Sequence, residues 1–341
     1  MCNPPELRID VPAVKHSRRA LAAALATSLS LSLPVAPAEA QQFSSSPEFE
    51  ALLARYAPGV DPDQVRALGV LAALLASIAI AIPMVKNGKV TSPSREHTHT
   101  LQVDGRNRTY DVVLPRGFDS EKSYPVVLGF GGWHHTSANM HDYSNLESQF
   151  PGAIVVYGQG VDNAWGGAPY ADTSIDEDVT YTKAVLNDVA SRYNADTSRT
   201  VAVGLSNGGG MVAALACHAP ETVRGVASVA GAFYSPTVAG CTSGEVPMMI
   251  MHGTNDGVVG YNGGFRHGAS YESVEDVARM FARKNDCAMV ASTSRSGSIT
   301  TFDFEHCSAP VRIERVEGGG HTWFDSPSAT RQTAQFLRRY L

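Results

Sequence analysis

The sequence feature that most constrains the fold is a short apolar segment that runs into a glycine-rich turn around a serine. Residues Thr200–Val203 are followed by Gly204-Leu205-Ser206-Asn207-Gly208-Gly209-Gly210, and small apolar residues continue to Cys217. This order predicts a buried strand, a sharp turn with Ser206 at its tip, and a helix. Glycines two residues on either side of the serine let backbone and helix approach closely. Ser206 is therefore a candidate nucleophile, although a chain with 31 glycines could also carry this pattern in an ordinary loop.

Short apolar segments of this kind recur along the chain and are expected to be strands. They are Pro125–Phe130, Ala153–Tyr157, Thr200–Gly204, Val226–Gly231, Pro247–His252 and Arg312–Val316. Before them, Leu101–Val103 and Arg108–Leu114 flank Asp104-Gly105, a dipeptide that favours the turn of a β-hairpin. His97-Thr98-His99 is interpreted as the start of a strand rather than as a metal site.

Amphipathic segments separate the expected strands. Apolar side chains spaced by three and four residues predict one helix with Val179, Thr182, Leu186, Val189 and Tyr193 on its buried face. A second helix is expected over Glu272–Asn285, and the last one near Ser326-Pro327. Alternating buried strands and helices predict an α/β fold with a mainly parallel sheet and helices on both faces.

A serine hydroxyl becomes a strong nucleophile only when a neighbouring imidazole removes its proton, and a carboxylate then orients the imidazole. Asp256 follows the expected strand Pro247–His252, and His321 follows Arg312–Val316 in the loop Gly318-Gly319-Gly320-His321. Nucleophile, acid and histidine thus occur in the chain order that is typical of hydrolases with a nucleophile elbow. Ser206, Asp256 and His321 are the predicted triad. His252 is the alternative base, but a hydrogen bond to the loop that carries Asp256 is the expected role.

The same chemistry needs two donors for the negative oxygen of a tetrahedral intermediate. The N–H of Asn207, directly after the serine, is one expected donor. The loop after Val126–Phe130 contains Gly131-Gly132-Trp133, and the N–H of Trp133 is the other. Trp133, Trp165 and Trp323 are candidates for the substrate-binding wall, with core packing as the alternative for each.

Other features set limits on function. A net charge of −6 and the lack of clustered Lys and Arg argue against nucleic-acid binding. His134, His135, His141 and His267 lack a partnered spacing, although the first two are expected to border the site. No metal or cofactor is expected, because no C-x-x-C pair or Cys/His cluster occurs. An acyl ester is the expected small-molecule partner, and the sequence leaves the oligomeric state open.

Residues 1–40 are expected to be a signal peptide. Lys15, Arg18 and Arg19 precede the apolar run Ala20–Val35, and Ala38-Glu39-Ala40 resembles a cleavage site. Export to an oxidising compartment would allow Cys217, Cys241, Cys287 and Cys307 to form two disulfides. Of the three possible connectivities, we expect Cys217–Cys241 and Cys287–Cys307, because each pair brackets one local segment.

Residues 41–95 are predicted to form a polar stalk followed by an apolar helix. The helix spans Ala67–Val85, nineteen residues without a charge, which approaches the length needed to cross a bilayer core. Small residues recur at every fourth position, at Gly69, Ala73, Ser77 and Ala81, and would allow close helix packing. We expect this segment to associate with a membrane, the alternative being a packing helix of a soluble domain.

The region from about Val103 onward resembles secreted esterases of the polyhydroxybutyrate depolymerase and feruloyl esterase type. The similarity rests on the Ser206 and Asp256 motifs, on Gly320-His321-Thr322-Trp323, and on the segments Tyr157–Val161 with Ala164-Trp165 and Asp176–Val179. It implies an α/β-hydrolase fold over residues 96–341 and the same triad. The sequence departs from the family at Gly131-Gly132, where His-Gly is usual, and Ala67–Val85 lies outside the resemblance.

The predicted function is that of an exported serine esterase acting through an acyl-enzyme. The apolar helix favours a substrate of the cell envelope or of a lipid phase, such as an acylated glycolipid, on the outer face of the cytoplasmic membrane or outside the cell. A polyhydroxyalkanoate depolymerase or a feruloyl or acetyl polysaccharide esterase is the first alternative. An envelope acyltransferase would use the same triad, and a non-catalytic binding protein would keep only the fold.

Overall fold

The computed structural model describes residues 95–341. The predicted signal peptide (1–40), the stalk and the apolar helix Ala67–Val85 lie outside the described residues. Within the described range, no helix combines the length and the apolar character that a membrane span requires.

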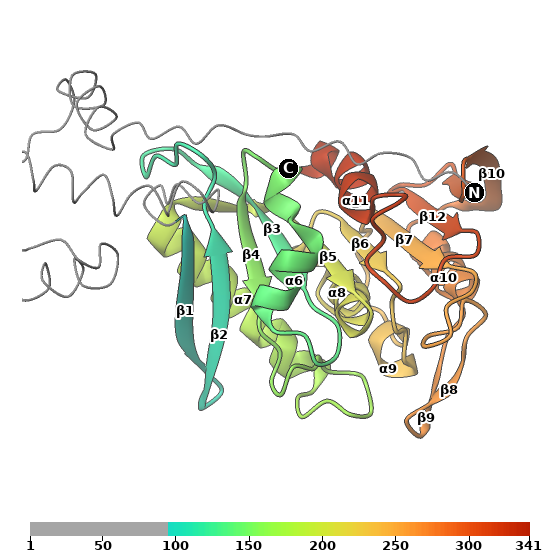
Figure 1. Cartoon of the computed structure of the whole chain (residues 1–341), viewed down its shortest axis with the longest axis horizontal. Helices are drawn as coiled ribbons and strands as arrows, with labels where there is room; N and C mark the ends of the chain where they lie inside the picture. The colour runs from blue at the N-terminus through green and yellow to red at the C-terminus, as the bar shows by residue number, and fades with distance from the viewer. Residues whose placement is uncertain (1–94) are drawn as a thin grey trace, which may run out of the picture. The chain divides into compact units, whose positions relative to one another are not determined.

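A ten-stranded sheet forms the centre of this region (Figure 1). Its strands, in spatial order, are β1 (Glu96–Val103), β2 (Arg106–Val113), β4 (Ile154–Gly158), β3 (Tyr124–Phe130), β5 (Ala195–Leu205), β6 (Val226–Val229), β7 (Met248–Gly253), β12 (Val311–Val316), β11 (Ile299–Glu305) and β10 (Ala288–Ser296). The six strands from β4 to β12 pair in parallel, and antiparallel strands flank them on both sides. The predicted mainly parallel α/β sheet and the first hairpin are therefore confirmed.

Two features of the sheet region were not expected from the sequence. The sheet continues past β12 into the antiparallel strands β11 and β10, whose side chains are mostly half-buried or exposed. A separate two-stranded ribbon, β8 (Gly264–Arg266) and β9 (Ala269–Tyr271), projects beyond the sheet (Figure 1), and a single antiparallel bridge joins its Tyr271 to Tyr234. Neither pair of strands has the apolar content by which buried strands are recognised.

Helices cover both faces of the sheet, as predicted. They are α6 (Ser137–Ser144), α7 (Ile175–Tyr193), α8 (Asn207–His218), α9 (Ser235–Val238), α10 (Val274–Lys284) and α11 (Ala329–Leu337), with 3-10 turns at Leu146–Ser148, Pro220–Thr222 and Arg338–Tyr340. Core residues of α7, α8 and α10 pack on one face, and those of α6 and α11 pack on the other (Figure 1).

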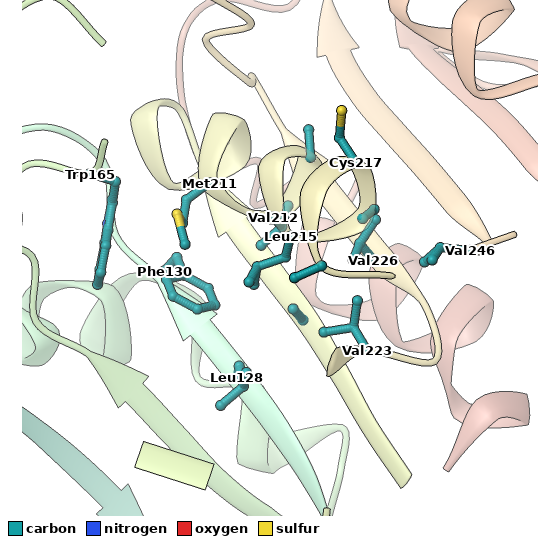
Figure 2. Packing of buried hydrophobic residues seen from close by; sticks show 14 of the residues in the cluster. Leu128, Phe130, Trp165, Met211, Val212, Leu215, Cys217, Val223, Val226 and Val246 are labelled. Carbon is teal, nitrogen blue, oxygen red and sulfur yellow. The ribbon is translucent and has the colours of Figure 1, made fainter. Parts of the chain in front are cut away.

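The central strands bury both of their faces, and successive side chains alternate between the two cores. In β3, Val126, Leu128 and Phe130 belong to the core under α7 and α8, whereas Val127 belongs to the core under α6 and α11. Figure 2 shows α8 side chains packed above Leu128 and Phe130, with Trp165 beside them. This two-sided burial explains why the strands read as continuous apolar runs.

Helix ends follow local capping chemistry. Ser174 caps α7, and its hydroxyl and the Glu177 side chain form a reciprocal capping box. The last helix begins slightly later than the sequence suggested. Ser328 is its N-cap, with the hydroxyl accepting a hydrogen bond from Arg331 N–H, so the predicted start near Ser326-Pro327 is corrected by two to three residues.

Both predicted disulfides are confirmed. Cys217 at the end of α8 is bonded to Cys241, and Cys287 is bonded to Cys307 across the base of the β10–β11 hairpin. Each bond closes a local segment, with sequence separations of 24 and 20. The first bond secures the far end of the helix that begins at Ser206.

A buried carboxyl group lies on the α11 face of β12. Glu314 is 3% exposed, and its Oε2 has no hydrogen-bond partner within residues 95–341. Arg312 Nη1 lies 3.9 Å from Oε1, but the Arg312 guanidinium makes shorter hydrogen bonds of 2.6 and 2.9 Å to Asp303. Burial therefore raises the pKa of Glu314 to about 7, although the charge of Arg312 opposes the shift.

We predict that Glu314 makes the protein less stable as pH rises from its ordinary pKa of 4.5 toward 7. In this window the unfolded chain releases a proton that the folded protein retains, so the free energy of unfolding falls by up to about 3 kcal/mol. Urea denaturation of the wild type and of Glu314→Gln between about pH 5 and 8 measures this difference. Glu314→Gln should show a flatter profile, and the exposed control Glu121→Gln should not. Equal slopes for Glu314→Gln and wild type would contradict the prediction.

Candidate active site

The glycine-rich turn Gly204–Gly210 places Ser206 between β5 and α8. Ser206 has φ 54° and ψ −115°, a backbone conformation that side-chain-bearing residues seldom adopt. Three backbone hydrogen bonds hold it there: Ser206 N–H donates to Val229, and the Ser206 carbonyl accepts from Gly210 and Ala232. The side chain is thereby raised at the carboxyl end of the parallel sheet.

The two glycines that flank the serine are required by close backbone contacts. A Cβ on Gly204 would lie 2.0 Å from the carbonyl oxygen of Gly208. A Cβ on Gly208 would lie 2.2 Å from the carbonyl oxygen of Phe130, at the end of β3. Both distances are far below van der Waals contact, so only glycine allows α8 to start this close to β5 and β3.

The sheet brings His321 and Asp256 to the same edge as Ser206. Gly253 of β7 pairs in parallel with Val316 of β12, so the loops that leave these two strands start side by side. His321 Nε2 lies 2.9 Å from Ser206 Oγ, and His321 Nδ1 lies 2.8 Å from Asp256 Oδ2. The structure therefore places the three residues in one hydrogen-bonded chain.

Asp256 is buried and its carboxylate is surrounded by donors. Oδ1 accepts from Val258 N–H and Val259 N–H at 2.9 and 2.8 Å, and Oδ2 faces His321 and His252, the latter at 3.1 Å. Burial alone would raise the pKa of Asp256, but the hydrogen bonds from His252, His321 and Val259 outweigh it and hold the pKa well below its ordinary value. Asp256 is thus an anion at neutral pH, fit to orient an imidazole.

His252 supports the loop that carries the acid, as the sequence suggested. The ring is fully buried, and its Nε2 lies 2.9 Å from the carbonyl oxygen of Val259. This carbonyl is an acceptor, so Nε2 carries the proton and also points at Asp256 Oδ2. His252 has no hydrogen bond to Ser206, and the alternative of His252 as the base has no geometric support.

The two expected oxyanion donors belong to different elements that both lie close to the serine. Asn207 is the first residue of α8, where an N–H has no partner within the helix. The chain after β3 passes close to Ser206, because a Cβ on Gly132 would lie 3.2 Å from Ser206 Cβ. Neither Asn207 N–H nor Trp133 N–H donates to another group of residues 95–341. Both are free to bind an oxygen atom.

A bridge that the sequence did not reveal joins the segments of these two donors. The Asn207 side chain pairs with the backbone of Trp165: Oδ1 accepts from Trp165 N–H at 2.7 Å, and Nδ2 donates to its carbonyl at 3.1 Å. Trp165 Nε1 in turn donates to the carbonyl of Gly131 at 3.0 Å. The indole thus links the helix start after Ser206 to the loop that holds Trp133.

Behind this bridge lies a buried ion pair. Arg108 of β2 donates to Asp178 of α7 at 2.8 Å, and both side chains are almost fully buried. Asp178 also accepts from Gly166 N–H at 2.7 Å and from Thr173 at 2.8 Å, which fixes the residue next to Trp165. Burial raises the pKa of Asp178 despite these partners. The ion pair therefore anchors the loop that carries Trp165 to the edge of the sheet.

A cavity of about 240 Å³ opens beside Ser206 and His321. Its wall is formed largely by aromatic and imidazole side chains: Trp133, His135, Tyr143, Tyr170, Tyr234 and His267. Burial, with the nearby charges of His321 and His134, lowers the pKa of His135. His135 borders the cavity as expected, whereas His134 stacks on Trp133 with ring centroids 4.1 Å apart.

Of the three tryptophans predicted to bind substrate, only Trp133 lines this cavity. Trp165 and Trp323 are 2% and 3% exposed and belong to the two cores, where Trp323 Nε1 donates to Thr330 at 3.0 Å. The packing alternative therefore replaces the predicted wall role for both. Tyr170 also stacks on Trp133 at 4.1 Å, and two rings cannot lie that close over one face. Trp133 is consequently stacked between Tyr170 and His134, and His267 packs edge-to-face against it with ring centroids 5.0 Å apart.

Comparisons with known proteins agree with this geometry. The model of the family "Esterase", described as "Putative esterase", matches residues 102–259. Feruloyl esterase C of Emericella nidulans is 30% identical over 233 residues, which are 64% of this chain and 77% of that protein. Feruloyl esterase D of Neurospora crassa is 26% identical over 79% of this chain and 95% of its own length.

A solved structure shows the same fold at low sequence identity. An acetyl xylan esterase from Aspergillus awamori superposes with a TM-score of 0.52 over 70% of this chain and 99% of its own, at 15% identity. The shared architecture is the α/β-hydrolase fold that the sequence predicted for the region after residue 96.

We predict that Trp165→Phe lowers kcat by about tenfold on a 4-nitrophenyl ester while KM changes little. Phe keeps an aromatic ring in the core but is smaller than the indole and has no N–H, so the carbonyl of Gly131 loses its donor and the loop that holds Trp133 loosens, which acts mainly on the transition state. Steady-state kinetics and thermal denaturation measure both effects.

Tyr110→Phe is the matched control for this substitution. It also removes one hydrogen bond of a buried aromatic residue, that of the Tyr110 hydroxyl to Asp188, and neither residue lines the cavity. It should lower stability similarly and leave kcat unchanged. If both variants lost kcat in proportion to their loss of stability, the bridge would have no special role.

Proposed function

Because the chain belongs to the esterase family that includes the feruloyl esterases, we propose that it hydrolyses carboxylic esters through a covalent intermediate on Ser206. The observation that carries this proposal is the hydrogen-bonded chain from Asp256 through His321 to Ser206 beside an open cavity. A weak nucleophile becomes reactive when an adjacent base accepts its proton and a third group orients that base.

In the proposed first half-reaction, Ser206 Oγ attacks the ester carbonyl carbon while His321 Nε2 takes the hydroxyl proton. The Asp256 carboxylate accepts the hydrogen bond from Nδ1 and stabilises the imidazolium. The oxygen of the tetrahedral intermediate binds the N–H groups of Asn207 and Trp133. The intermediate then collapses, His321 returns the proton to the departing alkoxide oxygen, and the alcohol leaves the acyl group on Ser206.

Water completes the cycle by the same route. His321 removes a proton from a water molecule as the water oxygen attacks the acyl carbonyl carbon. The second tetrahedral intermediate expels Ser206 Oγ, which recovers its proton from His321, and the carboxylic acid is released. A sugar hydroxyl in place of water would give acyl transfer instead, so product analysis with an added sugar acceptor separates hydrolase from transferase.

The names of the relatives support a feruloyl ester as the first substrate to test. The alternative that the sequence raised, an acylated glycolipid at the cell envelope, depends on Ala67–Val85, which lies outside the described residues. Methyl ferulate, a soluble short-chain ester and an acylated glycolipid in mixed micelles distinguish these classes by kcat/KM. The two disulfides support a site of action in an oxidising compartment outside the cytoplasm.

We predict that Ser206→Ala lowers kcat on a soluble 4-nitrophenyl ester by a factor on the order of 10⁴ or more. A fluorophosphonate probe should label the wild type at Ser206, as located by peptide mass spectrometry, and should not label the variant. Ser120→Ala, which alters an exposed loop serine, is the control and should keep full activity and labelling. Hydrolysis that survives in purified Ser206→Ala would refute the proposed nucleophile.

A further inference from the structure

One part of the cavity wall carries hydrogen-bond donors that the protein itself does not use. Tyr170 lies in the loop before α7, Tyr234 comes directly before α9, and Arg266 ends β8. All three line the cavity that contains Ser206. The proposed ester hydrolysis assigns no role to any of them.

Of the three residues, Tyr234 gives the strongest indication that this part of the wall binds a ligand. Its side chain is 2% exposed, yet its hydroxyl makes no hydrogen bond within residues 95–341. This oxygen is not among the enclosed unpaired polar atoms of the described residues, so it is accessible from the cavity, where a ligand can reach it. Tyr170 packs edge-to-face against Tyr234 with ring centroids 6.0 Å apart, and its hydroxyl is likewise without a partner in this part of the chain. Two phenol groups of the cavity wall are thus available to a ligand.

Arg266 adds a positive charge next to these hydroxyls. Its Nε donates to His267 at 3.1 Å and its Nη1 to the carbonyl of Val258 at 3.3 Å, and its Nη2 has no partner among residues 95–341. Burial raises the pKa of Tyr170 and of Tyr234, and the charge of Arg266 opposes the rise in both cases. One guanidinium therefore lies within electrostatic reach of both phenols.

The charge of the cavity is opposite in sign to that of the chain. The chain has a net charge of −6, but no Asp or Glu is among the residues that line the cavity. Within residues 95–341, Arg266 has no carboxylate at ion-pair distance, and both oxygens of Asp256 are occupied by their own donors. An uncompensated guanidinium beside two free hydroxyls is suited to a group that only accepts hydrogen bonds.

We propose that Tyr170, Tyr234 and Arg266 form a subsite for a carboxylate group carried by the ester substrate. The inference rests on the proposed hydrolysis at Ser206 and narrows its substrate to esters with an acidic acyl or alcohol part. A carboxylate can accept from the guanidinium and from both phenols at once, which a neutral ester group or a single hydroxyl cannot match.

Matched pairs of esters test the subsite on each side of the scissile bond. The acyl-side pair is 4-nitrophenyl hydrogen succinate and its neutral methyl ester. The alcohol-side pair is 3-acetoxybenzoate and its methyl ester. In at least one pair, the wild type should prefer the carboxylate by about tenfold or more in kcat/KM, mainly through KM. The preference should weaken with added salt.

Single substitutions show which residues cause the preference for the charged ester. Arg266→Gln should reduce the ratio of charged to neutral kcat/KM by about tenfold, and Tyr234→Phe by a smaller factor. Arg295→Gln removes an exposed arginine of β10 that does not line the cavity, and it should leave the ratio unchanged. No preference for the carboxylate in either pair, or an equal loss in Arg266→Gln and Arg295→Gln, would overturn the subsite. An undiminished preference for the charged ester in Arg266→Gln would also overturn the subsite.

A binding measurement separates failure of the subsite from failure of the proposed function. Free succinate and 3-hydroxybenzoate should slow fluorophosphonate labelling of the wild type and have a weaker effect on Arg266→Gln. If the probe labels Ser206 and neither carboxylate protects it, the subsite is wrong while the nucleophile stands. If neither labelling nor hydrolysis of the neutral esters occurs, the proposed function itself fails.

Discussion

The close backbone contact between the start of α8 and the ends of β5 and β3 is the constraint on which the rest of the site depends. It exists because Gly204 and Gly208 have no side chains, and their Cβ positions are already filled by carbonyl groups. The contact sets the unusual backbone conformation of Ser206 and directs the first N–H groups of α8 toward the same region. A hydroxyl and a free donor thus arise from one turn.

The parallel sheet then supplies the remaining groups through strand order. Ser206 and Asp256 follow β5 and β7, which are separated only by β6, and His321 follows β12, the neighbour of β7. The carboxyl ends of these strands lie along one edge, so residues 115 positions apart in sequence come within 2.9 Å. On the other side of Ser206, Trp165 and the Arg108–Asp178 pair connect the loop after β3, which holds Trp133, to β2.

The sequence was informative wherever burial imposes a pattern. Five of the six parallel strands contain runs of apolar residues that are buried on both faces, β12 keeps apolar residues on its α10 face, and Ser206, Asp256 and His321 come shortly after β5, β7 and β12. The sequence carries no signal for contacts between residues that only the tertiary fold brings together. Nothing in the sequence around Asn207 indicates that its amide pairs with Trp165, 42 residues away, or that Trp165 and Trp323 are buried while Trp133 is not. The polar strands of β8 to β11 lack the apolar alternation that would have predicted them.

The β8–β9 ribbon contributes Arg266 and His267 to the cavity wall but contributes neither Ser206, Asp256 nor His321, which bears on how related proteins come to differ in substrate. The segment enters between β7 and α10 without joining the main sheet, and its only contact of strand type with the rest of the described residues is the bridge from Tyr271 to Tyr234. Arg266 and His267 are exposed and donate no hydrogen bond to Asp256 or Ser206, so both can be replaced while the hydrogen bonds that hold Asp256 and Ser206 keep their partners. With Arg266 as part of the proposed subsite, substrate preference can change by substitution in this segment at little cost to the folded core, so related chains can share one reaction and differ in the esters they accept.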